Sequence, residues 1–109
     1  MREVTDQDAG QSVRLSRGEL LVITLRENPT TGYRWKVEAN GEPFCRLTRD
    51  NFEPGLALGA EGTHAWRFRA ARLGATRIRL TLQRPWKPAA RPARSFVLRV
   101  RVSPTPTLP

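Results

Sequence analysis

Apolar and polar residues alternate with a period of two along the C-terminal half of the chain, over residues 63–71, 76–82 and 95–102. In each segment large apolar side chains fall on one face and mostly arginines on the other. The residues of the apolar face are His64, Trp66, Phe68, Ala70, Ile78, Leu80, Leu82, Phe96, Leu98, Val100 and Val102. Such strict alternation is the pattern of β-strands with one buried and one solvated face.

The N-terminal half shows a different pattern. Residues 19–25 contain a nearly continuous apolar run, whose shortness and β-branched content predict a strand buried on both faces. Tyr33, Trp35 and Val37 alternate in the next segment, which the turn signal Asn40-Gly41 ends. Residues 13–15 and 44–47 are weaker candidates for strands.

No segment has the pattern of an amphipathic helix, so the predicted fold class is all-β. The segments above give about seven strands with turn signals at the spacing of an immunoglobulin-like β-sandwich. A five-stranded barrel of the OB type is the alternative. We expect residues 1–102 to form one domain and the proline-containing residues 103–109 to form a frayed, extended tail.

The composition fits a globular domain with a strong positive charge. Hydrophobic residues make up 39% of the chain, and no apolar run approaches the ~18 residues that a membrane span needs. The first ten residues contain no apolar core of a signal peptide. We therefore expect a monomer without membrane contact, cytoplasmic as it stands, or periplasmic or secreted if a leader has been trimmed.

The charge comes almost entirely from arginine. Lys and Arg number 19 against 10 Asp and Glu, a net charge of +9. We expect one basic sheet surface formed by Arg67, Arg69, Arg77, Arg79, Arg99 and Arg101. Such a surface makes nucleic-acid binding the alternative function. The aromatic residues alternate to the opposite side, however, where they could not stack on bases, so nucleic acid is not the expected partner.

Candidates for catalysis or metal binding are few. The single cysteine, Cys45, excludes an internal disulfide and is interpreted as a small buried residue. The single histidine, His64, alternates with Trp66 and has no second histidine to form a metal site or a plausible nucleophile to activate. We expect no catalytic residue, no metal ion and no cofactor.

Three connections between the predicted strands stand out: residues 28–33, 54–62 and 84–92. They would join the second and third, the fourth and fifth, and the sixth and seventh strands. In an immunoglobulin-like sandwich such loops gather at one end. The three connections are therefore expected to form one contiguous binding edge.

The first connection should form a stiff polar tip. Pro29 fixes its own φ and drives Asn28 towards extended geometry, while Gly32 permits a positive φ. The hydroxyls of Thr30 and Thr31 can bond to the local backbone. A tip that is already ordered loses little entropy on entering a narrow cleft. An ordinary hairpin turn remains the plain alternative.

The other two connections place apolar side chains where water is the expected neighbour. Leu56 and Leu58 lie in a glycine-containing stretch whose backbone can approach and pair with another surface. They could instead cover the edge of the sandwich. Arg84 and Trp86 head the third connection, and these residue types are frequent hot spots of binding. Packing of Trp86 against its own strands is the alternative.

These residues resemble the signatures of a known family. The run Asn28-Pro29-Thr30-Thr31-Gly32-Tyr33, followed by Trp35, is similar to the first signature of the chagasin family of cysteine-peptidase inhibitors, and Arg84-Pro85-Trp86 is similar to the third. The resemblance runs from about Leu20 to Val102. The family's middle signature, Gly-any-Gly-Gly, is met here by Gly59-Ala60-Glu61-Gly62. If its third position requires positive φ, Glu61 is strained by ~1 kcal/mol, which would affect affinity or target choice more than fold.

The resemblance implies a function and a role for each loop. The chain would be a reversible, tight, non-covalent inhibitor of papain-like cysteine peptidases. The tip at Thr30 and Thr31 would cover the catalytic centre of the peptidase. Residues 58–62, from Leu58 through Ala60 to Gly62, would run along the non-primed subsites, and Trp86 would lie over the primed side. Roughly 1,600 Å² of total buried surface is normal for such a complex.

Overall fold

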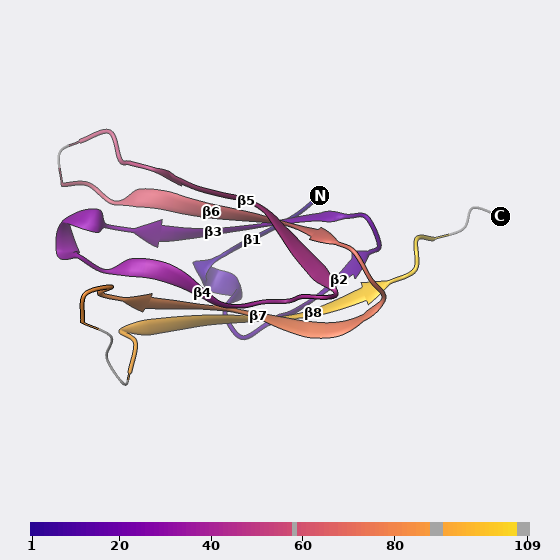
Figure 1. The fold of residues 1–109 in the computed structure, drawn as a ribbon. Helices are drawn as coiled ribbons and strands as arrows, with labels where there is room; N and C mark the ends of the chain where they lie inside the picture. Colours follow the sequence, from indigo (N-terminus) through magenta and orange to yellow (C-terminus); the bar gives the residue numbers. More distant parts are fainter. Residues whose placement is uncertain (58, 88–90, 107–109) are drawn as a thin grey trace.

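The computed structural model describes residues 1–57, 59–87 and 91–106, and it contains two facing four-stranded sheets (Figure 1). The first sheet consists, in spatial order, of β1 (Arg2–Thr5), β3 (Leu20–Glu27), β6 (Gly62–Ala70) and β5 (Cys45–Glu53). The second consists of β2 (Ser12–Ser16), β8 (Arg94–Ser103), β7 (Gly74–Gln83) and β4 (Arg34–Asn40). The short 3-10 turns are η1 (Asp6–Asp8) and η2 (Pro29–Thr31). None of the described helical segments is long and apolar enough to cross a membrane.

The arrangement confirms the predicted β-sandwich, and the barrel alternative is wrong because the strands pair into two separate sheets. All seven predicted strands are present, and β1 is an eighth. This strand runs parallel to β3 at the edge of the first sheet, and Val4 is its one buried residue. Four residues with a single apolar position show no periodicity, so the sequence gives no signal for β1.

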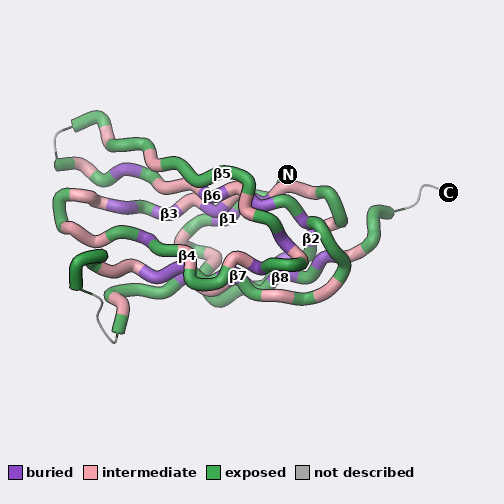
Figure 2. Tube along the Cα trace, viewed as in Figure 1, coloured by how far each residue is buried: buried purple, intermediate pink, exposed green. Residues whose placement is uncertain are grey.

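The core lies between the inner faces of the two sheets (Figure 2). It is built from the alternating apolar positions, and Trp66, Phe68 and Phe96 are the largest of its fully buried side chains. Cys45 is buried among them, and this burial raises the pKa of its thiol from 9.0 to about 11. The thiol is therefore neutral near pH 7, in keeping with its interpretation as a packing residue.

The prediction that residues 19–25 form a strand buried on both faces is wrong. In β3 the inward residues Leu21, Ile23 and Leu25 are buried, while Leu20 and Val22 on the outer face are only partly covered. In the part of the chain that the structure describes, no further layer of strands or helices lies over this outer face. Instead, Leu20 and Val22 are paired across the ladder with arginines of β6, whose aliphatic stems can shield apolar neighbours.

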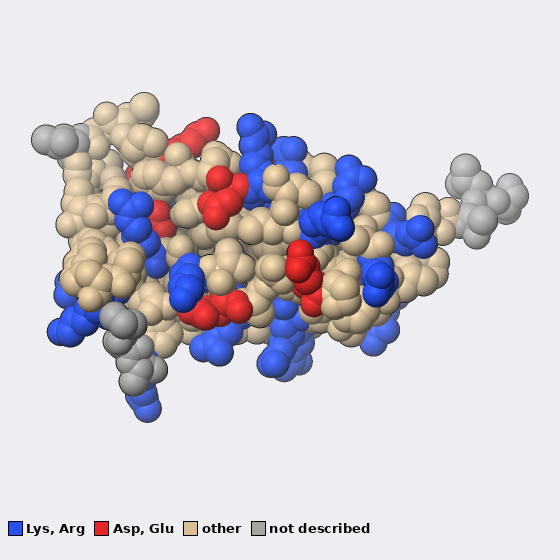
Figure 3. Space-filling model, in the orientation of Figure 1, with Lys and Arg blue, Asp and Glu red and all other residues tan. Residues whose placement is uncertain are grey.

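The prediction of a single basic surface is also wrong. Arg67 and Arg69 lie on β6 in the first sheet, whereas the other four predicted arginines lie on β7 and β8 in the second. The connection from β6 to β7 crosses from the first sheet to the second. The outward residues of β6 and those of β7 therefore lie on opposite sides of the sandwich. Basic side chains accordingly project from both the upper and the lower side in Figure 3.

Candidate functional site

The three connections singled out in the sequence lie together at one end of the sandwich, called here the loop end (Figure 1). They are the β3–β4 loop (residues 28–33), the β5–β6 loop (residues 54–61) and the β7–β8 loop (residues 84–93). Leu58 lies outside the described residues, as do Pro88, Ala89 and Ala90 in the third loop. All other predicted site residues belong to this end of the molecule.

The β3–β4 loop is ordered by its own side chains. Asn28 is extended (φ −112°, ψ 101°), and its Oδ1 accepts hydrogen bonds from the Thr30 amide at 3.1 Å and the Thr30 hydroxyl at 2.6 Å. The Thr31 hydroxyl donates to the Asn28 carbonyl at 2.7 Å. Gly32 closes the turn with φ 81°, the left-handed conformation that glycine adopts without strain. The tip is therefore rigid before it meets any partner.

A buried carboxylate supports this loop from below. Glu27 is 3% exposed, and its Oε1 accepts a hydrogen bond from the Trp35 amide at 2.7 Å, so it ties the last residue of β3 to β4 across the loop. The Nδ1 of His64 lies 3.3 Å from Oε2 of the same carboxylate, and the His64 ring stacks on Trp66 with centroids 3.9 Å apart. Asp50 contacts the opposite ring nitrogen. His64 is thus a structural residue at the edge of the core.

Sequence reasoning missed Glu27, although its position holds a usable signal. Every second residue of β3 points into the core, and these residues are Leu21, Ile23, Leu25 and Glu27. An acidic residue on the buried face needs hydrogen-bond partners. Here the partners belong to β4 and β6, which the sequence alone does not place beside it.

The β5–β6 loop stands next to the first loop and is linked to it. The Asn28 side-chain amide donates to the Gly59 carbonyl at 3.4 Å, and the Glu61 carboxylate lies 4.0 Å from the Arg26 guanidinium. Leu56 is fully exposed, so the suggestion that it covers the sandwich edge is wrong. The strain expected at Glu61 is also absent: among the described residues only glycines have positive φ, and in this loop that glycine is Gly59, at 77°.

The β7–β8 loop packs against the first loop on its other side. A Cβ atom at Gly32 would overlap the six-membered ring of Trp86, so the indole rests directly on the glycine backbone. The Arg84 guanidinium carbon lies 4.6 Å from the centroid of the Tyr33 ring, a cation–π contact. Trp86 nevertheless stays 70% exposed. The indole is thus held at the outer edge of its six-membered ring, and most of its surface stays accessible to a partner.

Together the loops enclose a hollow of about 550 Å³ lined by residues of all three, among them Thr31, Glu61 and Arg84. The threonine hydroxyls are engaged in hydrogen bonds within their own loop. Within the described part of the chain, no three His, Cys, Asp or Glu side chains are grouped so as to hold a metal ion. The loop end offers a rigid contact surface of hydroxyls, backbone and one large indole.

A family model described as the chagasin family of peptidase inhibitors, I42, matches residues 14–100. The chain belongs to this family. Amoebiasin-1 of Entamoeba histolytica is 31% identical over 101 residues, covering 91% of this chain and 97% of the relative. Chagasin of Trypanosoma cruzi is 28% identical over 107 residues, covering 93% and 97%.

A solved structure agrees with the assignment to the chagasin family. The crystal structure of a cysteine protease inhibitor from Entamoeba histolytica superposes with a TM-score of 0.83 at 27% identity, and the match covers 94% of this chain and 95% of the other. Membership confirms the resemblance inferred from residues 28–33 and 84–86. Because chagasin-family members are peptidase inhibitors, it also confirms that the chain is not an enzyme. The roles of individual site residues remain predictions.

Proposed function

We propose that this protein inhibits papain-like cysteine peptidases by inserting its loop end into the active-site cleft, reversibly and without covalent chemistry. The observation that carries the proposal is the rigid tip at Thr30 and Thr31, flanked on one side by the β5–β6 loop and on the other by the exposed indole of Trp86. A solved relative, 27% identical, is itself described as a cysteine protease inhibitor. Nucleic-acid binding loses support because the arginines are divided between two faces.

Each loop has a distinct proposed role. The tip occupies the catalytic centre and excludes substrate and water from the peptidase's Cys–His pair. Residues 59–62 run along the non-primed subsites, where their backbone groups can pair with the cleft wall. Trp86, with Arg84 and Pro85, lies over the primed side. Because the tip is already ordered, little conformational entropy is lost on binding, and this favours tight association.

Titration of papain with the purified protein, followed with a fluorogenic peptide substrate, tests the proposal. We expect near-stoichiometric inhibition by the wild-type chain. Trp86→Ala should raise the inhibition constant roughly 30-fold or more, a loss of ~2 kcal/mol in binding free energy, because it removes an exposed aromatic anchor. Deleting Thr30 and Thr31 should raise it at least as much. Full papain activity in a large excess of folded protein would refute the proposal.

Leu73→Ala provides the matched control. Leu73 is also an exposed large apolar residue (44%), but it lies in the β6–β7 turn at the end of the sandwich opposite the loop end. Its truncation should leave the inhibition constant unchanged. Equal losses for Leu73→Ala and Trp86→Ala would show that inhibition does not depend on the loop end.

A further inference from the structure

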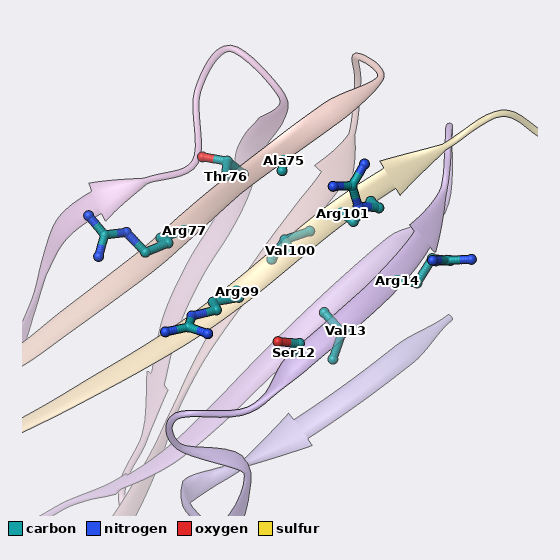
Figure 4. A pocket seen from close by; sticks show the side chains of 9 residues that line it. All are labelled: Ser12, Val13, Arg14, Ala75, Thr76, Arg77, Arg99, Val100 and Arg101. Carbon is teal, nitrogen blue, oxygen red and sulfur yellow. The ribbon is translucent and has the colours of Figure 1, made fainter.

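The outer face of the second sheet carries a compact group of arginines in the half of the sheet remote from the loop end. The register of β2, β8 and β7 arranges six residues in two neighbouring rows: Ser12, Arg99 and Arg77 in one, and Arg14, Arg101 and Ala75 in the other. Each row thus holds two adjacent arginines and one small residue. In Figure 4 the side chains of Arg77 and Arg99 extend side by side from their two strands.

These guanidinium groups make no ion pair with the carboxylates of the described residues. Within the described parts of the chain, none of the four lies within 4.0 Å of a carboxylate oxygen. Like charges directly opposite each other in a sheet are destabilising. An anion placed between them would remove this repulsion, so the fold itself favours an anionic ligand here.

The small residues give the group a concave shape. Ser12 stands beside Arg99 and Ala75 beside Arg101, and the space that their short side chains leave is part of an open hollow of about 720 Å³. The hollow is bordered by arginines from three strands. Arginines on neighbouring strands stand about 5 Å apart and those two residues apart on one strand about 7 Å. Such spacing suits a chain with oxyanions repeated every few ångströms.

The chemistry of the lining discriminates among anionic polymers. Guanidinium groups bind carboxylate, phosphate and sulfate alike through paired hydrogen bonds, and the hydroxyl of Ser12 can bond to sugar hydroxyls. None of the described residues that line the hollow is aromatic, although single-stranded nucleic acids are usually held by stacking on such rings. Dense basic patches are typical of sites that bind heparin or nucleic acid, and the lack of a stacking surface favours heparin. We propose that this hollow, called here the arginine hollow, binds a linear sulfated polysaccharide.

The first sheet provides an internal comparison. It also pairs arginines across strands, Arg46 with Arg69 and Arg49 with Arg67. Its hollow is smaller, about 310 Å³, and Leu20 forms part of the lining. The row of Arg67 also contains an acidic residue, Glu3, two strands away. We therefore expect weaker binding of polyanions on this face, although the number of arginines is similar.

Binding of a fluorescently labelled heparin hexasaccharide, measured by anisotropy over a range of NaCl concentrations, tests the proposal. The double variant Arg99→Ser/Arg101→Ser should lose more than ~10-fold in affinity, because two charge-assisted contacts disappear. It should also show a shallower dependence of affinity on salt. The matched variant Arg67→Ser/Arg69→Ser loses the same charge from the opposite face and should change affinity less than ~3-fold.

Several outcomes would overturn the proposal. These are no measurable heparin binding by the wild-type chain, equal losses for the two double variants, or tighter binding of a single-stranded oligonucleotide of equal charge. Thermal unfolding of both variants checks that they remain folded. The proposal is independent of peptidase inhibition, because the arginine hollow and the loop end share no residue. The Arg99→Ser/Arg101→Ser variant should inhibit papain like the wild type.

Discussion

A single buried carboxylate holds the base of the tip that we assign to the peptidase's catalytic centre. The Glu27 carboxylate accepts a hydrogen bond from the Trp35 amide on the far side of the loop. The Trp35 indole in turn donates a hydrogen bond to the Arg26 carbonyl at 3.0 Å. These two hydrogen bonds cross-link the strands on either side of the tip. Loss of the carboxylate would leave a buried amide without an acceptor, which costs about 1–3 kcal/mol.

Two replacements of Glu27 should separate the effect of its hydrogen bond from the effect of its negative charge. Glu27→Leu is expected to lower the free energy of unfolding by ~1–3 kcal/mol and to weaken papain inhibition, because the Trp35 amide loses its acceptor. Glu27→Gln keeps an oxygen acceptor and should retain most of both properties. Urea unfolding and papain titration measure the two effects. Equal behaviour of the two variants would show that the hydrogen bond does not position the loop.

At the residue scale the sequence predicted local conformations better than distant partners. The extended geometry of Asn28 and the positive φ of Gly32 follow from proline and glycine stereochemistry within six residues. The contact of Glu27 with His64 depends on β3 and β6 being neighbours. The strain considered at Glu61 depended on a positive φ at this position, and Glu61 does not have one.

At the scale of elements, the first and third loops act as one unit because Trp86 rests on Gly32. The glycine serves two purposes: it permits a left-handed turn and it leaves room for the indole. A side chain at this position would interfere with both. The two effects can be separated, because Gly10 has nearly the same φ, 80°, with nothing within 4 Å of the position of a Cβ atom.

Gly32→Ala and Gly10→Ala should therefore differ in a defined way. Both variants should lose ~1–2 kcal/mol in the free energy of unfolding, because alanine is strained in the left-handed region. Urea unfolding measures this loss. Only Gly32→Ala should also displace Trp86, which would raise the quenching of tryptophan fluorescence by acrylamide and weaken papain inhibition. If Gly32→Ala inhibited papain as well as Gly10→Ala does, the packing of Trp86 on Gly32 would have no part in binding.

The sequence predicted elements wherever alternation was long. The strands β6, β7 and β8 span nine or ten residues each, and their parity identified the buried face correctly. The strand β1 was missed because it has one apolar residue, and β3 was assigned two buried faces because leucine and valine fill its outer side as well. Apolar content alone does not distinguish an inner face from an outer one.

At the scale of the whole molecule, the high net positive charge lowers the stability of the folded state. A net charge of +9 on 109 residues produces self-repulsion, which salt screens. We expect the thermal midpoint of unfolding to rise by a few degrees between ~20 and ~200 mM NaCl. Differential scanning fluorimetry provides the measurement. A midpoint that fell with added salt would indicate that favourable ion pairs, not repulsion, dominate the surface.

The distribution of this charge was beyond sequence reasoning. Alternation showed which arginines face outwards, but not which sheet each strand joins. The assignment to two faces depends on the pairing of β6 with β3 and β5, and of β7 with β4 and β8. Two of these pairings, β3 with β6 and β4 with β7, join segments far apart in the chain, and local patterns carry little information about them.

The last strand leaves the sandwich on the side away from the loops (Figure 1). β8 begins beside the loop end and runs the length of the sheet to Ser103. A dye, a carrier or a solid support joined beyond this residue would therefore sit at the rear of the molecule. Immobilised in this way, every copy would present the same three loops outwards, ready to capture a peptidase from solution.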